Sequence, residues 1–412
     1  MAIGALIRGC REARGWSQDD LADALNHVLD TPTMTRSLVS RYESERRLPA
    51  SDKLLAALAG VFGVDKQVLR AEVKLSRVKR RTLLAAAAGG LAAAQTDLLA
   101  AIRPAPPPAS VSTENIKEVR QAAEWFTGLD HTYGGVLVRE SLLAHLRSSV
   151  QLLNAKCPPR LKPDLLSAVG YLGGVGGAMA FDAFVHDEGE QMFKFSRSCA
   201  EEAGDWHLYA KMSSWLGRQA IWRGDPAAGL GYIDLGLRRA EWLTATEQAM
   251  LYTARARGYA KQGLVRETLE AVDAADNAFS KASPTEDPPW MAYYDSAQHH
   301  GDTGHALFDL AVKHRAPFHA AERLHTAVQG HTDSYARSRA ISRTKLATLT
   351  MVTGDPAEAA NIGTTAIREA GRIKSRRAAA DLRELKVAAG PHATMPAIQK
   401  LRDRVEALVG SA

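Results

Sequence analysis

Cysteine is scarce in this chain, and its three cysteines lie far apart at Cys10, Cys157 and Cys199. None forms a Cys-x-x-Cys pair, so neither a disulfide framework nor a zinc knuckle is expected. We therefore expect a reducing compartment, the cytoplasm. Aromatic residues make up only 6% of the chain, and alanine is abundant while β-branched runs are few. This composition favours helices over sheets.

The chain also lacks the short motifs of common enzyme classes. It has no Gly-x-x-x-x-Gly-Lys-Ser/Thr phosphate loop, no His-Glu-x-x-His and no Gly-x-Ser-x-Gly. The glycines between Gly170 and Gly177 follow no predicted strand, so close helix packing explains them better than a dinucleotide site. Seven of the 13 histidines lie between His299 and His331, but steps of five and six residues scatter them around a helix. We expect no catalysis, no cofactor and no bound metal.

No membrane span is expected either. The uncharged run Thr82–Thr96 is shorter than the ~20 residues that cross a bilayer. Basic residues from Arg77 to Arg81 precede it, an order that resembles a twin-arginine export signal. Because the run begins after a complete domain, we expect an alanine-rich connecting helix. Ile102–Ala109, with four prolines, then predicts a stiff linker.

Positive charge is concentrated at the start of the chain. The formal net charge is +6, and the segment Met1–Arg81 alone holds 15 Lys and Arg against 10 Asp and Glu. The rest of the chain is close to neutral. A basic head on a neutral body indicates that the head binds a polyanion.

The same segment predicts five short helices. The first is amphipathic at 3–14, the second is capped by Ser17, the third is Thr35–Glu43, and two more reach about Arg70. The order SQxxLAxxL, then SLVSRYESERRLP, then a helix ending in FGV resembles the Cro/phage-repressor family, also called the xenobiotic-response-element type.

The resemblance implies a DNA-binding helix-turn-helix module whose third helix enters the major groove. Arginine grips guanine with two hydrogen bonds, whereas contacts to phosphates carry no sequence information. The alternative is a solvated charged face on which Glu43 and Glu45 pair with the arginines. The resemblance implies phosphate contacts at the start of helix 2 from Ser17 and Gln18, base contacts from Arg36, Ser37, Arg41 and more weakly Ser40, and backbone contacts from Arg46 and Arg47.

One feature departs from the family pattern. Gln18 and Glu43 are 25 positions apart, about eight more than the resemblance implies. The extra residues fall around Asn26–Met34, so we expect a lengthened second helix or a lengthened turn.

From about Ser112 the pattern is helical almost without a break. Two turns share the order Gly-Asp-Pro-Ala, beginning at Gly224 and Gly354; in each, Gly closes one helix, Asp caps the next and Pro suits its first turn. Further breaks at Gly263 and Pro317 divide the region into helical hairpins. This spacing predicts stacked hairpins of the tetratricopeptide type. An irregular α-bundle is the alternative.

Residues 129–135 (LDHTYGG), Cys199–Asp205 and Leu216–Ala227 resemble the regulatory half of actinobacterial regulators of sporulation and antibiotic production. Peptide-sensing quorum-sensing regulators share that layout. The resemblance implies a homodimer on a palindromic operator, whose repeats bind a small-molecule or peptide effector. Asparagines, which hold the peptide in the peptide-sensing group, are few here.

An enlarged connection at Ser283–Gly301 is rich in aromatic residues and histidine. Such a loop beside a concave repeat is a candidate to close over an effector. Simple packing of these rings on the repeats is the alternative. The candidate effector-binding residues are Trp290, Tyr293, Tyr294, His299 and His300.

Together these patterns predict an all-α protein, with a five-helix lambda-repressor-like helix-turn-helix domain at 1–72 and a connecting helix and linker at 73–112. An α-solenoid of tetratricopeptide-like hairpins is expected at 113–412, for dimerisation and effector binding. We predict a sequence-specific DNA-binding transcriptional regulator, with repression as the expected outcome. The alternative is a tetratricopeptide-type protein-interaction adaptor with a degenerate head.

Overall fold

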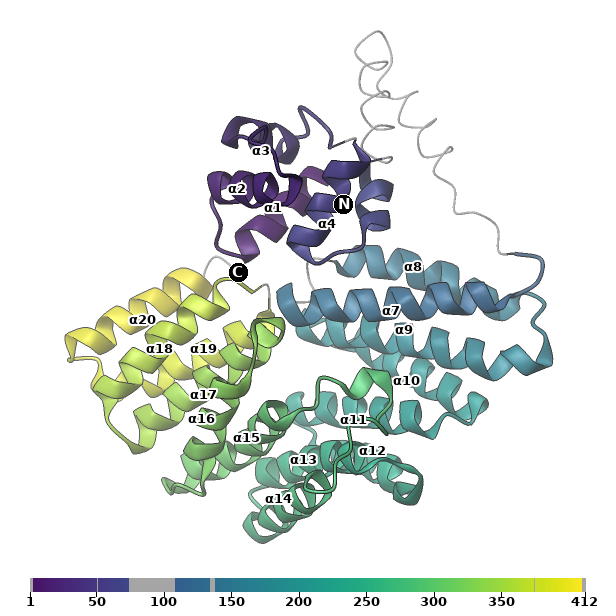
Figure 1. Ribbon diagram of the computed structural model, residues 1–412. Coiled ribbons are helices and arrows are strands. Elements are labelled where there is room, and N and C mark those ends of the chain that lie inside the picture. The colour runs from purple at the N-terminus through teal and green to yellow at the C-terminus, as the bar shows by residue number, and fades with distance from the viewer. Residues whose placement is uncertain (1–2, 50, 74–107, 134–137, 374, 410–412) are drawn as a thin grey trace. The chain divides into compact units, whose positions relative to one another are not determined.

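The computed structural model describes residues 3–49, 51–73, 108–133, 138–373 and 375–409 (Figure 1). The chain divides into two compact units, Met1–Pro106 and Pro107–Ala412, here called the head and the helical array. In the described parts of both units the structure is helical, and an isolated bridge between Ser110 and Lys156 is the sole β pairing. The predicted all-α fold class is confirmed. Nearly all of the predicted connecting helix and linker lies outside the described residues.

The head consists of α1 (Ile3–Ala13), α2 (Gln18–Leu29), α3 (Arg36–Glu43), α4 (Asp52–Phe62) and a further helical segment at 66–73. Hydroxyl side chains begin three of these helices, because an oxygen at the N-cap accepts a backbone N–H that has no partner within the helix. The caps are Ser17, Thr35 and Ser51. One apolar core, which includes Leu21, Val39 and Leu58, joins the five helices.

The segment Asn26–Met34, where the extra residues were expected, is divided between the end of α2 and the turn to α3. Helix α2 ends at Leu29, and Asp30 adopts a left-handed conformation with φ 51°. The Asn26 side chain then holds both backbone groups of Met34: its Oδ1 accepts from the Met34 N–H at 2.7 Å, and its Nδ2 donates to the Met34 carbonyl at 2.9 Å. Met34 itself is buried in the core. The Asn26 side chain therefore ties the end of the turn to α2, and this contact holds the start of α3 against α2.

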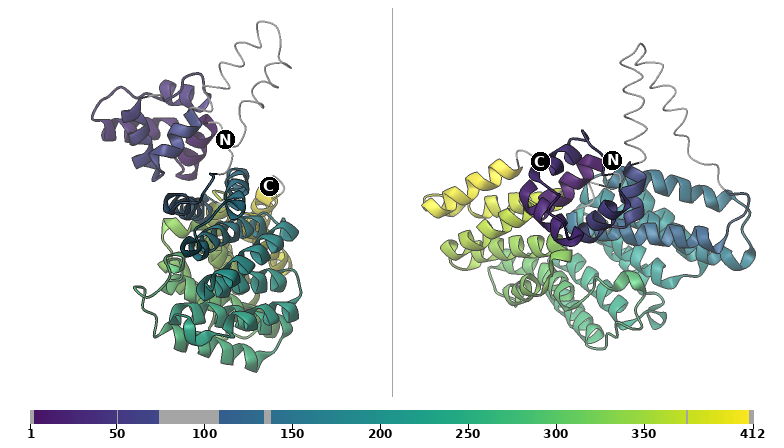
Figure 2. Two further views of the ribbon diagram at one scale, coloured as in Figure 1. Left: turned by 90° about the vertical axis from the view of Figure 1, so that its right-hand side faces the viewer. Right: turned by 45° about the horizontal axis from the view of Figure 1, so that its top comes forward.

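The array consists of two leading helices and six antiparallel hairpins (Figures 1 and 2). The helices are α7 (Thr113–Tyr133), α8 (Arg139–Gln151), α9 (Lys162–Asp182), α10 (His186–Ala203), α11 (Trp206–Trp222), α12 (Pro226–Leu237), α13 (Ala245–Gln262), α14 (Val265–Phe279), α15 (Ser296–His314), α16 (Ala320–Gly330), α17 (Ala336–Thr353), α18 (Pro356–Ala370), α19 (Arg376–Ala388) and α20 (Pro396–Val409). The predicted Gly-Asp-Pro turns occur where expected: Asp225 and Asp355 cap α12 and α18, each with Pro in its first turn.

The first helices of successive hairpins form one row. Each of α11, α13, α15 and α17 packs against its own hairpin partner and also against the first helix of the next hairpin. Side chains on the other side of this row, away from the hairpin partners, therefore face the interior of the curved array. This arrangement positions the cavity described below.

Helix α9 is apolar and packed on all sides. The segment Pro159–Asp182 is long and apolar enough to cross a membrane by length and composition, yet 83% of its most apolar window is buried inside the protein. Its glycines are sites of close approach: an added Cβ at Gly174 would lie 2.6 Å from Met212, and one at Gly177 would lie 2.7 Å from Phe193. The glycines thus serve helix packing, as the sequence predicted, and α9 is a core helix.

Contacts between distant parts of the chain close the array. The Arg337 guanidinium on α17 forms two bonds to Asp130 on α7, both 2.8 Å long, and lies 3.9 Å from Asp182 at the end of α9. Asp182 also accepts hydrogen bonds from Ser375 Oγ at 2.9 Å and from Arg377 Nε at 3.0 Å. The contacts among these five residues, here called the closing contacts, join positions that are 155 to 207 residues apart in sequence.

Substitution of Gly217 by alanine is expected to destabilise the array by about 1–3 kcal/mol, since overpacking forces a backbone shift. Helices α11 and α12 cross where Gly217 faces Gly229, and an added Cβ at Gly217 would lie 2.9 Å from the Gly229 carbonyl and 2.6 Å from Ile233. Urea unfolding followed by circular dichroism measures the change. The matched control is Gly231→Ala, also on α12, where nothing lies within 4 Å and stability should stay equal or rise. Equal stability of the two variants would contradict the close crossing.

Candidate nucleic-acid interface and effector residues

Helix α3 buries one side and presents basic groups on the other. Val39 and Tyr42 are buried in the head core, and Leu38 packs against it. The outward positions Arg36, Ser37 and Arg41 are exposed, and Ser40 is half-buried. The Arg36 side chain is 72% exposed and lies 3.9 Å from Asp19, itself on the surface. The predicted base-reading residues therefore share one accessible face.

A buried ion pair fixes α3 to α1. The Glu43 carboxylate is almost fully buried and accepts hydrogen bonds from Arg11 Nε at 2.5 Å and Nη2 at 3.1 Å. These hydrogen bonds, above all, raise the pKa of Arg11. Arg8 also lies 3.7 Å from Glu43. Among the described residues, Glu43 thus pairs with arginines of α1 and not with those on the outward face of α3.

The start of α2 is tied to the same carboxylate. Ser17 and Asp20 form a reciprocal cap, in which Ser17 Oγ accepts from the Asp20 N–H at 3.1 Å and Asp20 accepts from the Ser17 N–H at 2.7 Å. The Gln18 amide donates to Glu43 Oε2 at 2.8 Å. Ser17 is exposed and Gln18 is half-buried, with its amide directed toward the α3 end.

Arg46 and Arg47 follow α3 in a tight turn. Glu45 has a left-handed φ of 55°, and the Arg47 N–H donates to the Arg41 carbonyl at 3.0 Å. The turn is held further by Glu45, which accepts a hydrogen bond from the Gly4 N–H at 3.0 Å. Both arginines are exposed. They extend the basic surface beyond the last turn of α3.

The five predicted effector residues have different surroundings. Tyr294 and His299 are buried: His299 stacks on Phe279 with ring centres 4.3 Å apart, and its Nε2 lies 2.7 Å from Asp276 Oδ1. His300 is half-buried beside His299.

Trp290 and Tyr293 line cavities inside the array. Trp290 lies against Tyr171, with ring centres 5.2 Å apart, and its Nε1 is buried without a hydrogen-bond partner among the described residues. Of the five side chains, Trp290 and Tyr293 are thus the ones that line the two cavities described next.

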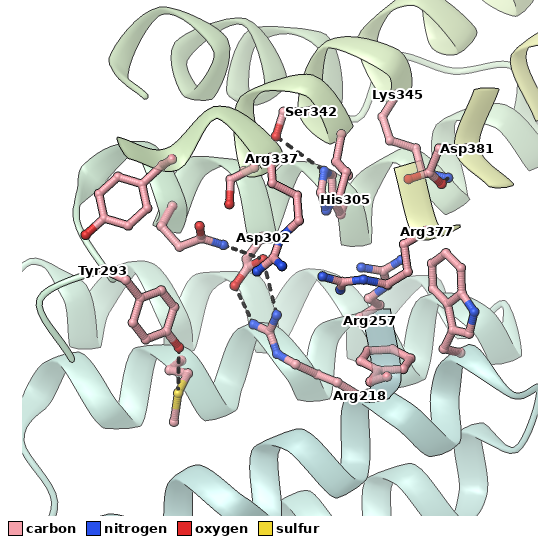
Figure 3. Close-up of a pocket in the computed structure, with 18 of the residues that line it drawn as sticks. Arg218, Arg257, Tyr293, Asp302, His305, Arg337, Ser342, Lys345, Arg377 and Asp381 are labelled. Carbon is pink, nitrogen blue, oxygen red and sulfur yellow. Dashed lines mark hydrogen bonds and ion pairs between the residues drawn. The ribbon is translucent and has the colours of Figure 1, made fainter. Parts of the chain in front are cut away.

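Two adjoining cavities lie along the row of first helices. Figure 3 shows side chains that line the larger one. The volume open to the centre of a water molecule is about 110 Å³ in the large cavity and about 50 Å³ in the small cavity. They share four lining residues: His131, Trp215, Tyr293 and Arg337. Much of the lining recurs at helical spacing on one face of each first helix, as at Lys211, Ser214, Arg218 and Trp222 on α11. This spacing is present in the sequence, but it did not indicate a cavity wall because its charged positions lie among apolar ones.

Burial and charge set the protonation states in the large cavity. Burial tends to raise the pKa of Asp302, but the Arg218 guanidinium outweighs it and the pKa lies below its ordinary value. Burial first, and then the positive charge of Arg257, lowers the pKa of His305 well below its ordinary value. At neutral pH Asp302 is therefore ionised and His305 is uncharged.

Among the residues that the structure describes, no group of three or more His, Cys, Asp or Glu side chains is arranged to hold a metal ion. The model of the family described as a helix-turn-helix domain matches residues 2–73. Searches of curated proteins and of solved structures gave no significant match. Residues 2–73 therefore form a helix-turn-helix domain, a kind of domain that is typical of DNA-binding regulators.

Proposed function

We propose that the protein is a sequence-specific transcriptional regulator in which α3 of the head reads DNA and the helical array responds to an effector. The observation that carries this proposal is the accessible face formed by Arg36, Ser37 and Arg41. It lies on the helix that enters the major groove in helix-turn-helix domains. Arg46 and Arg47, which follow α3, would neutralise phosphates of the DNA backbone.

We further propose a homodimer that binds a palindromic operator. Two heads related by a two-fold axis would place their recognition helices about one turn of DNA apart, or a multiple of it. An effector in the array would shift the balance between DNA-competent and incompetent arrangements of the heads. Light scattering on the full-length protein measures the assembly state, and footprinting on a selected duplex measures half-site spacing. A monomer that protects a single half-site would contradict this part of the proposal.

The DNA-reading role is tested with duplexes selected from a random library by the full-length protein. Arg36→Ala and Arg41→Ala should each reduce the preference for the selected duplex over a scrambled one by about 5- to 150-fold, since a good base contact contributes about 1–3 kcal/mol. Arg46→Ala should weaken both duplexes alike and flatten the salt dependence. Fluorescence anisotropy at several salt concentrations measures each affinity.

The control variant is Lys66→Ala, which also removes one positive charge from the head. Lys66 lies outside α2 and α3 and pairs with Asp52 at 3.1 Å. Sequence preference should not change in this variant. If Arg36→Ala and Arg41→Ala discriminate between the two duplexes as well as the unaltered protein does, the assignment of the α3 face is wrong.

A further inference from the structure

The interior cavity, meaning the large and small cavities together, is big enough for a small organic molecule. A single water needs about 10–15 Å³ of such space. The large cavity offers about 110 Å³ and the small cavity about 50 Å³. All lining residues belong to the array, from Thr127 on α7 to Asp381 on α19. The space thus accepts a molecule much larger than water without involving the head.

One guanidinium in the large cavity has no carboxylate within ion-pair distance among the described residues. Arg257 on α13 lines this cavity and forms no hydrogen bond or ion pair with any residue that the structure describes. Its charge is felt by the buried His305 and Asp302. The other cations of the lining each have a carboxylate within 4 Å: Arg218 with Asp302, Arg337 with Asp130, Arg377 with Asp182, and Lys345 with Asp381.

The small cavity contains a second cation of this kind. Lys211 is buried, donates to the Trp290 carbonyl at 3.0 Å, and lies 4.6 Å from the centre of the Tyr293 ring. No carboxylate of the described chain lies within ion-pair distance of its Nζ. Burial lowers the pKa of Lys211 to about 7. A bound anion would stabilise its charged form.

The walls between these two cations are flat and apolar. Trp215 and Tyr293 line both cavities, and Trp222 and Tyr335 line the large one. In the same wall the Ser214 hydroxyl is buried without a hydrogen-bond partner among the described residues. A polar group that is buried without a hydrogen bond raises the free energy of the folded protein, and a ligand that hydrogen-bonds to it recovers part of that free energy. Rings and cations together suit a molecule with a flat body and a negatively charged end.

We propose that the interior cavity binds a small organic anion, with its carboxylate or phosphate on Arg257 and its ring system against Trp215 and Tyr293. Guanidinium groups bind oxyanions through paired hydrogen bonds, and Arg257 is free to do so without giving up a carboxylate of the described chain. Lys211 adds a favourable charge from the small cavity. This inference rests on the proposed effector response and names the chemical class of the effector.

The test uses the full-length protein with three ligands of one shape: benzoate, phenyl phosphate and neutral benzamide. Trp215, Trp222 and Trp290 line the interior cavity, so tryptophan fluorescence reports binding, and calorimetry gives the affinity. At least one anion should bind tenfold or more tightly than benzamide, and the better anion identifies the charged group. Arg257→Gln should weaken anion binding tenfold or more and leave benzamide binding unchanged.

Arg255→Gln is the matched control, because Arg255 lies on the same helix but is paired with Asp234 away from the cavity. Anion binding should be the same in this variant. Lys211→Met provides a second test, with an expected loss of anion affinity. The inference is overturned if neither anion binds more tightly than benzamide, or if both Arg257→Gln and Lys211→Met bind anions as the unaltered protein does.

Duplex binding is measured on the same preparations without ligand. If the protein binds the duplex normally but binds neither anion more tightly than benzamide, only this inference is contradicted. If the protein binds an anion as expected but binds no duplex, only the proposed DNA-reading function is contradicted. The two results are therefore distinguishable.

Discussion

Replacement of Arg337 by methionine is expected to lower the free energy of unfolding of the helical array by about 3–5 kcal/mol, since it leaves a buried carboxylate without its partner. Asp130, which receives two bonds from Arg337, is 4% exposed, and Asp182, 3.9 Å from the same guanidinium, is fully buried. Urea unfolding followed by circular dichroism measures the loss. A change below about 1 kcal/mol, the size typical of surface pairs, would contradict a structural role for the closing contacts.

The matched control is Arg120→Met. Arg120 also joins α7 to another helix, through Asp164 on α9 at 2.7 Å, but both side chains are about half exposed. Its removal should cost less than about 1 kcal/mol. The double variant Arg337→Met with Asp130→Asn should recover part of the loss, because the buried carboxylate left without its partner is then replaced by a neutral amide.

The effect of Arg337→Met should depend on pH in a definite direction. Burial tends to raise the pKa of Asp130, but Arg337 outweighs it, so the folded pKa lies below the unfolded value of about 4. The stabilisation from this pair is therefore fully present above that unfolded value. It is lost as pH falls through the lower folded value. The difference in stability between the unaltered protein and the variant should thus narrow in acid.

Substitution of Glu43 by alanine is expected to destabilise the head by about 3–5 kcal/mol, since the Arg11 guanidinium is then left buried without its main partner. Glu43 also holds the Gln18 amide, so α1, α2 and α3 all lose a shared contact. A unit of this size has little stability in reserve. Binding to every duplex should therefore fall sharply, selected or scrambled, while the urea transition of the array stays unchanged. Anisotropy and circular dichroism measure the two quantities.

Glu12→Gln is the control for Glu43→Ala. Glu12 pairs with the same Arg11 at 3.2 Å, but its side chain is 59% exposed. We expect a loss below about 1 kcal/mol and normal duplex binding. If Glu43→Ala binds the selected duplex with unaltered affinity, Glu43 is not needed to position α3.

Local signals were sufficient to predict most of the fold. The cap at Ser17 and the two Gly-Asp-Pro turns act within a few residues, so the sequence shows them directly. The buried side of α3 followed from helical spacing alone. The segment Asn26–Met34, where extra residues were expected, forms the end of α2 and most of the turn to α3. Their anchoring by Asn26 was not predicted, because it depends on the path of the turn.

Long-range contacts were not predictable in the same way. Glu43 was a candidate partner for the outward arginines, and only the packing of α1 against α3 shows that it faces Arg11 instead. Nothing near Asp130 in the sequence indicates Arg337 as its partner. The candidate effector residues were chosen from an aromatic-rich loop. The cavity is formed instead mainly by single faces of several helices, which a linear reading does not bring together.

The closing contacts also affect how the array is made. In an open series of repeats each hairpin depends only on its neighbours, so folding can spread from either end. Here Asp130 and Asp182 obtain their partners only when Arg337, Ser375 and Arg377 are present. In a chain leaving the ribosome Asp130 therefore waits 207 residues for Arg337, and the early hairpins reach their final stability only after Arg377 has been made.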